Sequence, residues 1–245
     1  MTASAGNHGR ALAFAAREVN LPLTVYVPEH APKTKVDAIR ASGADLRPCR
    51  DYDDAERTAK ERAAAGDGLF ISPYSHPDVI AGAGTVALEI HDEWPDVDAI
   101  VVPIGGGGLI SGIALASRAI ASTTDIIGVE VEASSPFTHS LAAGRIVYID
   151  VGPSLADGLI GNLDPDTVTF NIVRENVSRI VVVDEDSLKK AIVHAHDREQ
   201  LVVEAAGAVG IAALLSRRLD LPGKRIAVVI SGGNIDPEKL TSLLA

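Results

Sequence analysis

The chain has 245 residues and carries a formal net charge of −11, from 22 Lys and Arg against 33 Asp and Glu. Hydrophobic residues make up 47% of it, which predicts a globular protein with one large or two small domains. An acidic chain without a basic cluster argues against nucleic acid and an anionic membrane surface as partners, and no apolar stretch is long enough to cross a bilayer. The single cysteine, Cys49, excludes an internal disulfide framework and favours a reducing cytoplasm.

Strand-like and helical patterns alternate along the chain. The expected strands are residues 23–27, 44–48, 69–72, 98–103, 125–130, 145–149, 179–183 and 225–230. The expected helices are residues 9–19, 33–42, 52–65, 79–94, 109–121, 136–143, 165–176, 186–197, 204–219 and 237–244. This alternation predicts an α/β fold with open, mostly parallel twisted sheets and helices on both faces.

A domain boundary is expected in the proline-containing stretch 73–77. It would separate a small α/β domain, 1–76, from a large α/β domain, 77–245, and a ligand cleft is expected between them. The chain opens directly on a site-like turn at residues 2–9, with no element before it. We therefore expect that an N-terminal portion is absent.

Four consecutive glycines, Gly105–Gly108, follow the apolar run 99–103 and precede a helical pattern that begins at Leu109. Backbone N–H groups without neighbouring side chains can surround an anion, and the helix N-terminus adds partial positive charge, so this turn predicts a phosphate site. A P-loop is excluded because Leu109 stands where the lysine is needed. A dinucleotide fingerprint, Gly106-x-Gly108-x-x-Ser111, stays an alternative, and so does a plain turn without a ligand.

The segment 4–9, Ser-Ala-Gly-Asn-His-Gly, precedes a second helical pattern. Its Ser4 and Asn7 suit ordinary helix caps, and the same groups suit a turn that binds a carboxylate.

Two further segments offer candidate residues near expected strand or helix ends. Ser231 follows the strand 225–230, at the edge of a parallel sheet where ligands bind, although a plain strand-to-helix turn explains it equally well. Glu204 precedes an apolar helix start and is either an acid with a perturbed pKa or a favourable charge at a helix N-terminus. His194 and His196 point to different faces of one helix and are expected at the surface, and no Cys/His cluster suits zinc.

Together these motifs resemble the fold-type II pyridoxal-phosphate enzymes, in the branch of the threonine/serine ammonia-lyases (dehydratases) and serine racemases. The resembling residues occur in family order along the whole chain: Ser4–Gly9, Val27-Pro28 with Pro32 and Lys35, Gly82-x-Gly84-Thr85, Gly105–Leu109, Gly128-Val129-Glu130, Ala156-Asp157-Gly158, Glu204 and Ser231–Asn234. The resemblance implies the two-domain fold of the tryptophan synthase β-like enzymes, with the cofactor pyridoxal 5'-phosphate in the cleft.

The resemblance also implies roles for individual residues. The cofactor phosphate would be held by Gly105, Gly106, Gly107, Gly108 and Leu109. Asn7 would bind the phenolic oxygen of the cofactor, and Ser231, with Gly232 beside it, would bind the pyridine nitrogen. Glu204 would lie near the cofactor ring. Ser4, Ala5, Gly6 and His8 would surround the carboxylate of a small amino-acid substrate. A metal ligand is implied at Glu130, where the neighbouring acidic partner is replaced around Ser135-Pro136.

The implied reaction is β-elimination from L-threonine or L-serine, which yields a 2-oxo acid and ammonia in amino-acid metabolism such as isoleucine biosynthesis. A serine hydroxyl at the pyridine nitrogen cannot keep it protonated, which favours loss of a β-substituent. The racemase branch carries a serine where this chain has Ala5, and a methyl group cannot transfer a proton. The cysteine synthase branch carries threonine in place of His8.

One departure concerns catalysis. The family's Schiff-base lysine lies in a Ser-Phe-Lys-x-Arg segment before the Asn7 turn, and that segment is absent from this sequence, so no catalytic residue is assigned. The resemblance implies that the missing segment is the N-terminal part of the large domain. We therefore expect little turnover by this chain alone. The alternative from another class is a catalytically silent protein that keeps the cofactor site for binding or interaction. A homodimer is the expected assembly.

Overall fold

The computed structural model describes residues 1–31, 33–120 and 123–244, which divide into two compact units, Met1–His76 (unit 1) and Pro77–Ala245 (unit 2). Pro32 and the expected end of the helix 109–121 lie outside the described residues. Every pair of named strands is parallel, so the predicted α/β class with parallel sheets is confirmed. None of the helices in the described ranges is both long enough and apolar enough for a membrane span.

Unit 1 is a three-stranded sheet with helices on both faces. Its elements are β1 (Thr2–Ala3), α1 (Asn7–Glu18), β2 (Thr24–Pro28), α2 (Lys33–Ala41), β3 (Asp45–Cys49) and α3 (Tyr52–Ala64), in the strand order β1-β2-β3. Alternate residues of β2 point to opposite faces: Val25 and Val27 pack with Ile39 of α2, whereas Tyr26 packs with Ala55 of α3.

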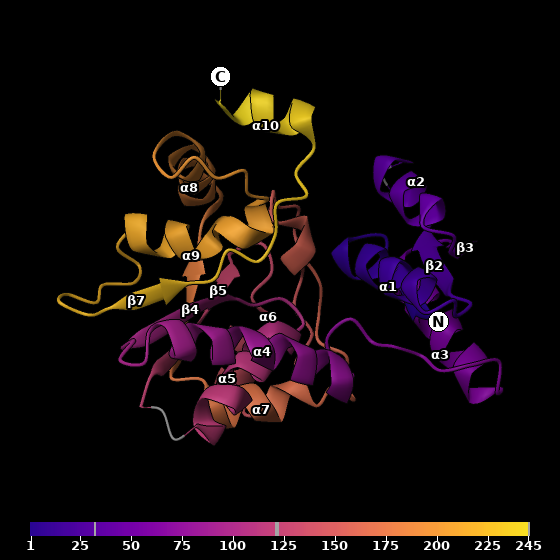
Figure 1. Ribbon diagram of the computed structural model, residues 1–245, viewed down its shortest axis with the longest axis horizontal. Helices are drawn as coiled ribbons and strands as arrows, with labels where there is room; N and C mark the ends of the chain where they lie inside the picture. The colour runs from indigo at the N-terminus through magenta and orange to yellow at the C-terminus, as the bar shows by residue number, and fades with distance from the viewer. Residues whose placement is uncertain (32, 121–122, 245) are drawn as a thin grey trace. The chain divides into compact units, whose positions relative to one another are not determined.

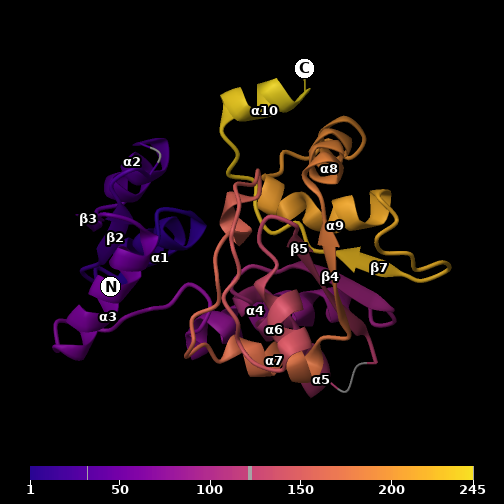
Figure 2. The ribbon, with the colours of Figure 1, turned by 180° about the vertical axis from the view of Figure 1, so that it is seen from behind.

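Unit 2 is a four-stranded sheet in the order β6-β5-β4-β7. Its elements are α4 (Pro77–Glu93), β4 (Ala99–Pro103), α5 (Gly108–Ala119), β5 (Asp125–Val131), α6 (Pro136–Ala143), η1 (Asp157–Leu159), α7 (Thr169–Asn176), β6 (Arg179–Val183), α8 (Glu185–Asp197), α9 (Ala205–Leu215), β7 (Ile226–Val228) and α10 (Pro237–Leu244). Helices α8 and α9 cover one face of this sheet, and α4, α5 and α7 cover the other (Figures 1 and 2).

The central strand β4 shows why the sheet is buried on both faces. Ala99 and Val101 belong to the core on the α9 side, and Ile100 and Val102 belong to the core on the α5 side. All four are at most 1% exposed, as expected for a continuous apolar run in a parallel sheet.

Two expected strands are wrong. Residues 145–149 form no strand because side chains satisfy their backbone: Ser140 Oγ accepts from Val147 N–H at 3.1 Å and Asn162 Oδ1 from Ile149 N–H at 2.9 Å. Residues 69–72 are also outside any strand, although Ile71 N–H donates to the Met1 carbonyl at 2.9 Å.

Several element boundaries also differ from expectation. The two-residue strand β1 and the short helix η1 were not predicted. The last predicted long helix, 204–219, ends at Leu215 because Arg217 adopts a positive φ of 56°. Helix α7 begins at Thr169 instead of residue 165, since residues 164–167 form a turn in which Thr167 N–H donates to the Asp164 carbonyl.

Candidate functional site

The glycine turn, Gly105–Gly108, connects β4 to α5 at the carboxyl edge of the unit 2 sheet. Ile104 N–H still belongs to the sheet and donates to the Val129 carbonyl at 3.0 Å, and Ser111 N–H donates to the Gly107 carbonyl at 3.0 Å. Between them, within the described part of the chain, the N–H groups of residues 105–110 have no hydrogen-bond partner. A set of open N–H groups at a helix N-terminus can bind an anion.

The shape of the glycine turn depends on its lack of side chains. Gly107, the N-cap of α5, has a φ of +85°, and a Cβ built on it would lie 2.5 Å from Phe137 Cζ and 3.1 Å from Thr169 Cβ. The Thr169 hydroxyl also donates to the Gly106 carbonyl at 2.8 Å. Phe137 and Thr169 therefore hold the turn from behind. Sequence reasoning missed both residues, because they are far from the turn in the chain and no local pattern marks them.

Unit 2 brings the glycine turn together with the segments of Glu204 and Ser231. A Cβ on Gly105 would lie 3.1 Å from Leu159 Cα, and one on Gly158 would lie 3.2 Å from the Ala206 side chain. The next residue of α9, Gly207, is equally close to the Ser231-Gly232 segment, because a Cβ on Gly207 would lie 2.9 Å from the Gly232 carbonyl oxygen. Gly105–Gly108, η1, the start of α9 and Ser231-Gly232 thus form one continuous group.

Glu204 is held by its backbone and its side chain against the same loop. It is the N-cap residue of α9, and its N–H donates to the Gly232 carbonyl at 3.0 Å. Its carboxylate lies beside Gly232, since a Cβ there would approach Glu204 Oε1 to 2.2 Å. The Ser231 side chain next to it is exposed. Glu204 therefore fixes the course of the backbone that carries the Ser231 hydroxyl.

The serine turn, residues 4–9, lies in unit 1, where it connects β1 to α1. Ser4 Oγ accepts hydrogen bonds from Gly6 N–H and Gly9 N–H, both at 3.2 Å. Ser4 thereby stabilises the first turn of α1, but neither Ser4 nor Asn7 is its N-cap, because that position is Gly6 and the helix begins at Asn7. The hydroxyl proton of Ser4 is not used in those two bonds. Ala5, Gly6 and His8 are half-buried and Asn7 is exposed, and their roles toward a ligand stay predictions.

Glu130 is fully buried at the end of β5 and binds the first turn of α6. Its Oε1 accepts from Phe137 N–H at 2.8 Å, and its Oε2 accepts from Thr138 N–H at 2.9 Å and the Thr138 hydroxyl at 2.6 Å. Burial raises the pKa of the Glu130 carboxyl, and the donors of Phe137 and Thr138 offset part of that increase. In the described ranges no three side chains of His, Cys, Asp or Glu gather as a metal site. The cation expected at Glu130 stays a prediction.

The Glu130→Gln variant is expected to have a free energy of unfolding about 2 kcal/mol lower than that of the parent chain near pH 5. The side-chain amide places an NH2 group, which only donates, where one of the two carboxyl oxygens accepts from buried N–H groups. A raised pKa means that the folded carboxyl keeps a proton that the unfolded chain has already released. Stability conferred by this proton is present below pH 4.5, the ordinary value, and is lost as the pH rises through the folded-state pKa. Urea unfolding of both chains from pH 4.5 to 7 should therefore show a shrinking difference in unfolding free energy. A difference that grows with pH would contradict the raised pKa.

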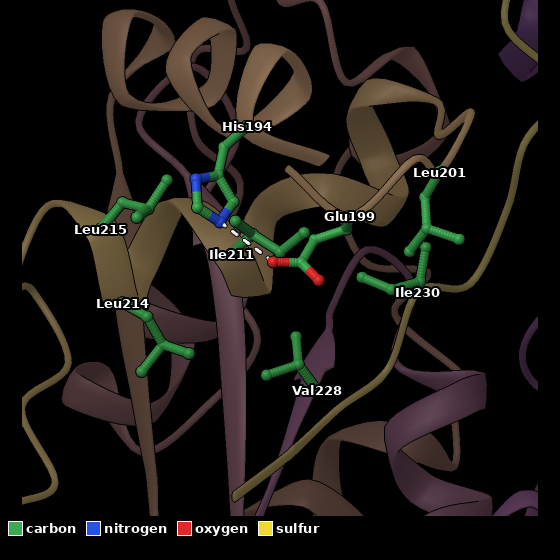
Figure 3. Close-up of a pocket in the computed structure, with 8 residues that line it drawn as sticks. All are labelled: His194, Glu199, Leu201, Ile211, Leu214, Leu215, Val228 and Ile230. Atoms are coloured by element: carbon green, nitrogen blue, oxygen red, sulfur yellow. Dashed lines mark ion pairs between the residues drawn. The ribbon is translucent and has the colours of Figure 1, made fainter. Parts of the chain in front are cut away.

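An apolar hollow lies beside the edge strand β7, and none of the residues that line it is a candidate site residue (Figure 3). His194 Nε2 and Glu199 Oε1 lie 3.5 Å apart among these residues. The residues that line the hollow are His194, Glu199, Leu201, Ile211, Leu214, Leu215, Val228 and Ile230.

Comparison with known families decides what the glycine turn belongs to. The family model described as "Pyridoxal-phosphate dependent enzyme" matches residues 1–232. The chain belongs to this family. Pyridoxal phosphate is the family's cofactor, so the resemblance and the cofactor inferred from the sequence are confirmed.

Ammonia-lyases and racemases are among the similar proteins. An L-threonine ammonia-lyase of Geobacter sulfurreducens is 45% identical over 98% of this chain and 60% of its own length. One from Thermotoga maritima is 39% identical over 100% of this chain and 61% of its own. The structure of maize serine racemase matches with a TM-score of 0.91 at 32% identity, over 98% of this chain and 74% of that one. The chain thus spans about three fifths of the length of the two ammonia-lyases.

The residues present in unit 2 fit pyridoxal phosphate. The open N–H groups of residues 105–110 suit its phosphate, and Phe137 excludes any side chain from position 107 of the cradle. The exposed Ser231 hydroxyl, on the loop held by Glu204, suits a ring nitrogen as hydrogen-bond partner.

Proposed function

We propose that these residues belong to an ammonia-lyase that eliminates water from L-threonine or L-serine to give an enamine. The enamine then takes up water and yields a 2-oxo acid and ammonia. The observation that carries the proposal is the row of open N–H groups at residues 105–110, in one continuous group with Glu204 and Ser231. When bound, pyridoxal phosphate withdraws electrons from the amino acid's Cα, so that the Cα proton and the β-hydroxyl can leave. The similarity to named L-threonine ammonia-lyases supports this choice of reaction.

In this proposal each predicted site residue of unit 2 has a simple task. The N–H groups of Gly105–Gly108 and Leu109 hold the phosphate, and Gly232 keeps Ser231 in place beside Glu204. The Ser231 hydroxyl is neutral and pairs with the ring nitrogen without holding it protonated, which favours elimination over reactions that need a stronger electron sink. Asn7 of unit 1 donates to the phenolic oxygen.

The serine turn is proposed to bind the substrate carboxylate. Because Ser4 Oγ already accepts two N–H bonds, its proton is the part of the hydroxyl that can be donated to a ligand. The carboxylate would also meet the backbone N–H groups of Ala5 and His8 at the positive end of α1, beside Gly6, whose own N–H donates to Ser4 Oγ. Since the Ala5 methyl group transfers no proton, elimination is favoured over the serine racemase reaction.

The second alternative is a catalytically silent protein that keeps the cofactor site for binding. It follows from the lysine segment, which these 245 residues do not contain. We propose that the 245 residues alone turn over little substrate, and that they work in the cytoplasm, as a homodimer and in amino-acid metabolism such as isoleucine biosynthesis.

Pyridoxal phosphate is expected to raise the thermal unfolding midpoint of the chain. A ligand specific for the native state at about 100 times its Kd adds about 2.7 kcal/mol to the unfolding free energy. Pyridoxal, which lacks the phosphate, should give a much smaller shift, since the glycine turn contributes nothing to its binding. No shift with pyridoxal phosphate, or an equal shift with NAD, would contradict the proposed site and favour the dinucleotide alternative.

Adding a small primary amine to the solution distinguishes the ammonia-lyase hypothesis from the hypothesis of a catalytically silent protein. Methylamine can supply the base that the lysine would provide, and pyridoxal phosphate with L-threonine should then yield a 2-oxo acid above the protein-free background. The matched control is a chain with an altered glycine turn, Gly107→Ala, which should return the rate to background. A silent binding protein gives no increase over background.

A further inference from the structure

A chain of hydrogen bonds in unit 1 runs from His8 through Thr2 to Ile71. His8 Nε2 lies 3.1 Å from Thr2 Oγ1, and the Thr2 hydroxyl donates to the Ile71 carbonyl oxygen at 2.7 Å. The Thr2 side chain is fully buried in β1. His8 belongs to the serine turn, so the chain connects that turn to the segment that leads out of unit 1.

The Thr2 hydroxyl determines which nitrogen of His8 carries a proton. A carbonyl oxygen only accepts, so the single hydroxyl proton of Thr2 points to Ile71. Toward His8, Thr2 Oγ1 can then only accept, and His8 Nε2 must be the donor. A neutral imidazole has one N–H, which leaves Nδ1 with an open lone pair.

The surroundings of His8 keep the ring neutral. Burial lowers the pKa of His8, the nearby His76 ring lowers it further, and the Ile71 carbonyl raises it by a smaller amount than burial lowers it. Among the described residues, the ring interacts with Thr2, Ile71 and His76. At neutral pH the ring offers a ligand one hydrogen-bond acceptor, Nδ1, and no donor.

This arrangement has a consequence for the amino acid in the proposed function, on which the inference rests. A carboxylate only accepts hydrogen bonds, so it binds the backbone N–H groups and the Ser4 hydroxyl and not the His8 ring. A β-hydroxyl can donate to an open nitrogen lone pair. We propose that Thr2 is a positioning residue that holds His8 as the Nε2–H tautomer, so that His8 Nδ1 accepts a hydrogen bond from the β-hydroxyl of the substrate.

The tautomer can be read directly from the ¹⁵N-labelled chain of 245 residues. Two-bond ¹H–¹⁵N correlation spectra should show a protonated Nε2 and a bare Nδ1 for His8, with signals assigned from single His→Gln variants. His139 is an internal reference of the opposite kind, because its Nδ1 lies 2.9 Å from the Ser135 carbonyl and must carry the proton. A protonated Nδ1 on His8 at neutral pH overturns the proposal.

Variants of Thr2 test whether this residue sets the tautomer. Thr2→Val keeps the size and removes the hydroxyl, so His8 should lose its single tautomer and give averaged nitrogen signals. Thr2→Ser restores the hydroxyl and should restore the parent pattern. A Thr2→Val spectrum identical to that of the parent overturns the proposal. Thr2→Val leaves buried groups unpaired, so if it does not fold, the parent and Thr2→Ser spectra decide.

Amino-acid titrations in the presence of pyridoxal phosphate test the link to the substrate. L-Serine should shift the His8 Nδ1 signal, and L-alanine, which lacks the hydroxyl, should leave it in place while still shifting the amide signals of residues 4–9. Equal Nδ1 shifts with both amino acids overturn the β-hydroxyl contact and leave the carboxylate turn intact. If neither amino acid shifts any signal of residues 4–9 although His8 is the Nε2–H tautomer, then this turn does not bind the amino acid. That result overturns the proposed function at this turn and the contact between His8 and the substrate, while Thr2 would still set the tautomer.

Discussion

Replacing Gly107 by alanine is expected to destabilise unit 2 by about 3 kcal/mol and to weaken pyridoxal phosphate binding by at least about tenfold. Two effects add at this position. A residue with a Cβ costs about 1–2 kcal/mol at the left-handed φ of +85°. The new methyl group would also lie 2.5 Å from Phe137 Cζ in a buried ring packing, and overpacking of this kind costs about 1–3 kcal/mol.

The loss of binding follows from the direction in which the turn can relax. Phe137 is fully buried, and Thr169 holds the Gly106 carbonyl, so the strain is relieved by moving the turn away from both residues. That movement takes the N–H groups of residues 105–110 out of their common orientation. Pyridoxal phosphate should lose affinity in the variant, whereas pyridoxal should bind the variant and the parent equally.

Urea unfolding followed by tryptophan fluorescence measures the stability term. Trp94 is the only tryptophan of the chain and directly follows α4, so its signal reports on unit 2. Gly144→Ala is the matched control, because Gly144 has a φ of +68° and open space around a Cβ. That variant should lose about 1 kcal/mol from backbone strain and keep its affinity for pyridoxal phosphate. Equal losses in the two variants would show that Phe137 does not brace the turn.

Most of the fold could be predicted from the sequence because the patterns that indicate strands, helices and turns are local. β4 is an apolar run that the sheet buries on both faces, and the bounds of β4 and β5 differ from the expected ones by at most one residue at either end. The glycine turn was recognisable for the same reason, since its glycines, the strand before it and the helix after it are contiguous. Strand β1 gave no such signal, because two residues are too few to show a period.

The parts of the site that the sequence did not reveal depend on contacts between distant residues. The metal-ligand role expected for Glu130 stays a prediction, and the structure adds that its carboxylate binds the N–H groups of Phe137 and Thr138, seven and eight residues further on. Phe137 and Thr169 brace the glycine turn from α6 and α7, and Thr2 reaches Ile71 across 69 residues. A pattern along the chain contains no information about such pairings unless the fold is already known.

Replacing Gly112 by alanine is expected to destabilise unit 2 by about 2 kcal/mol or more, although alanine is the better helix former by about 1 kcal/mol. Gly112 lies in the middle of α5, where this helix meets α4. A Cβ there would lie 2.2 Å from the Ile80 carbonyl oxygen and 2.6 Å from Gly84 N, both backbone atoms of α4. No rotamer change can relieve these contacts, so the two helices must separate and open the core beneath them.

Gly82→Ala is the matched control, because Gly82 lies on α4 itself with nothing within 4 Å of a built Cβ. At this exposed position only the helix propensity changes, and the variant should gain about 0.5–1 kcal/mol. Urea unfolding followed by Trp94 fluorescence should therefore give opposite signs for the same chemical change on two packed helices. A Gly112→Ala chain as stable as the parent would mean that α4 and α5 are further apart than the structure places them. Since α5 begins at the glycine turn, that outcome would also leave the proposed phosphate cradle without its rigid support.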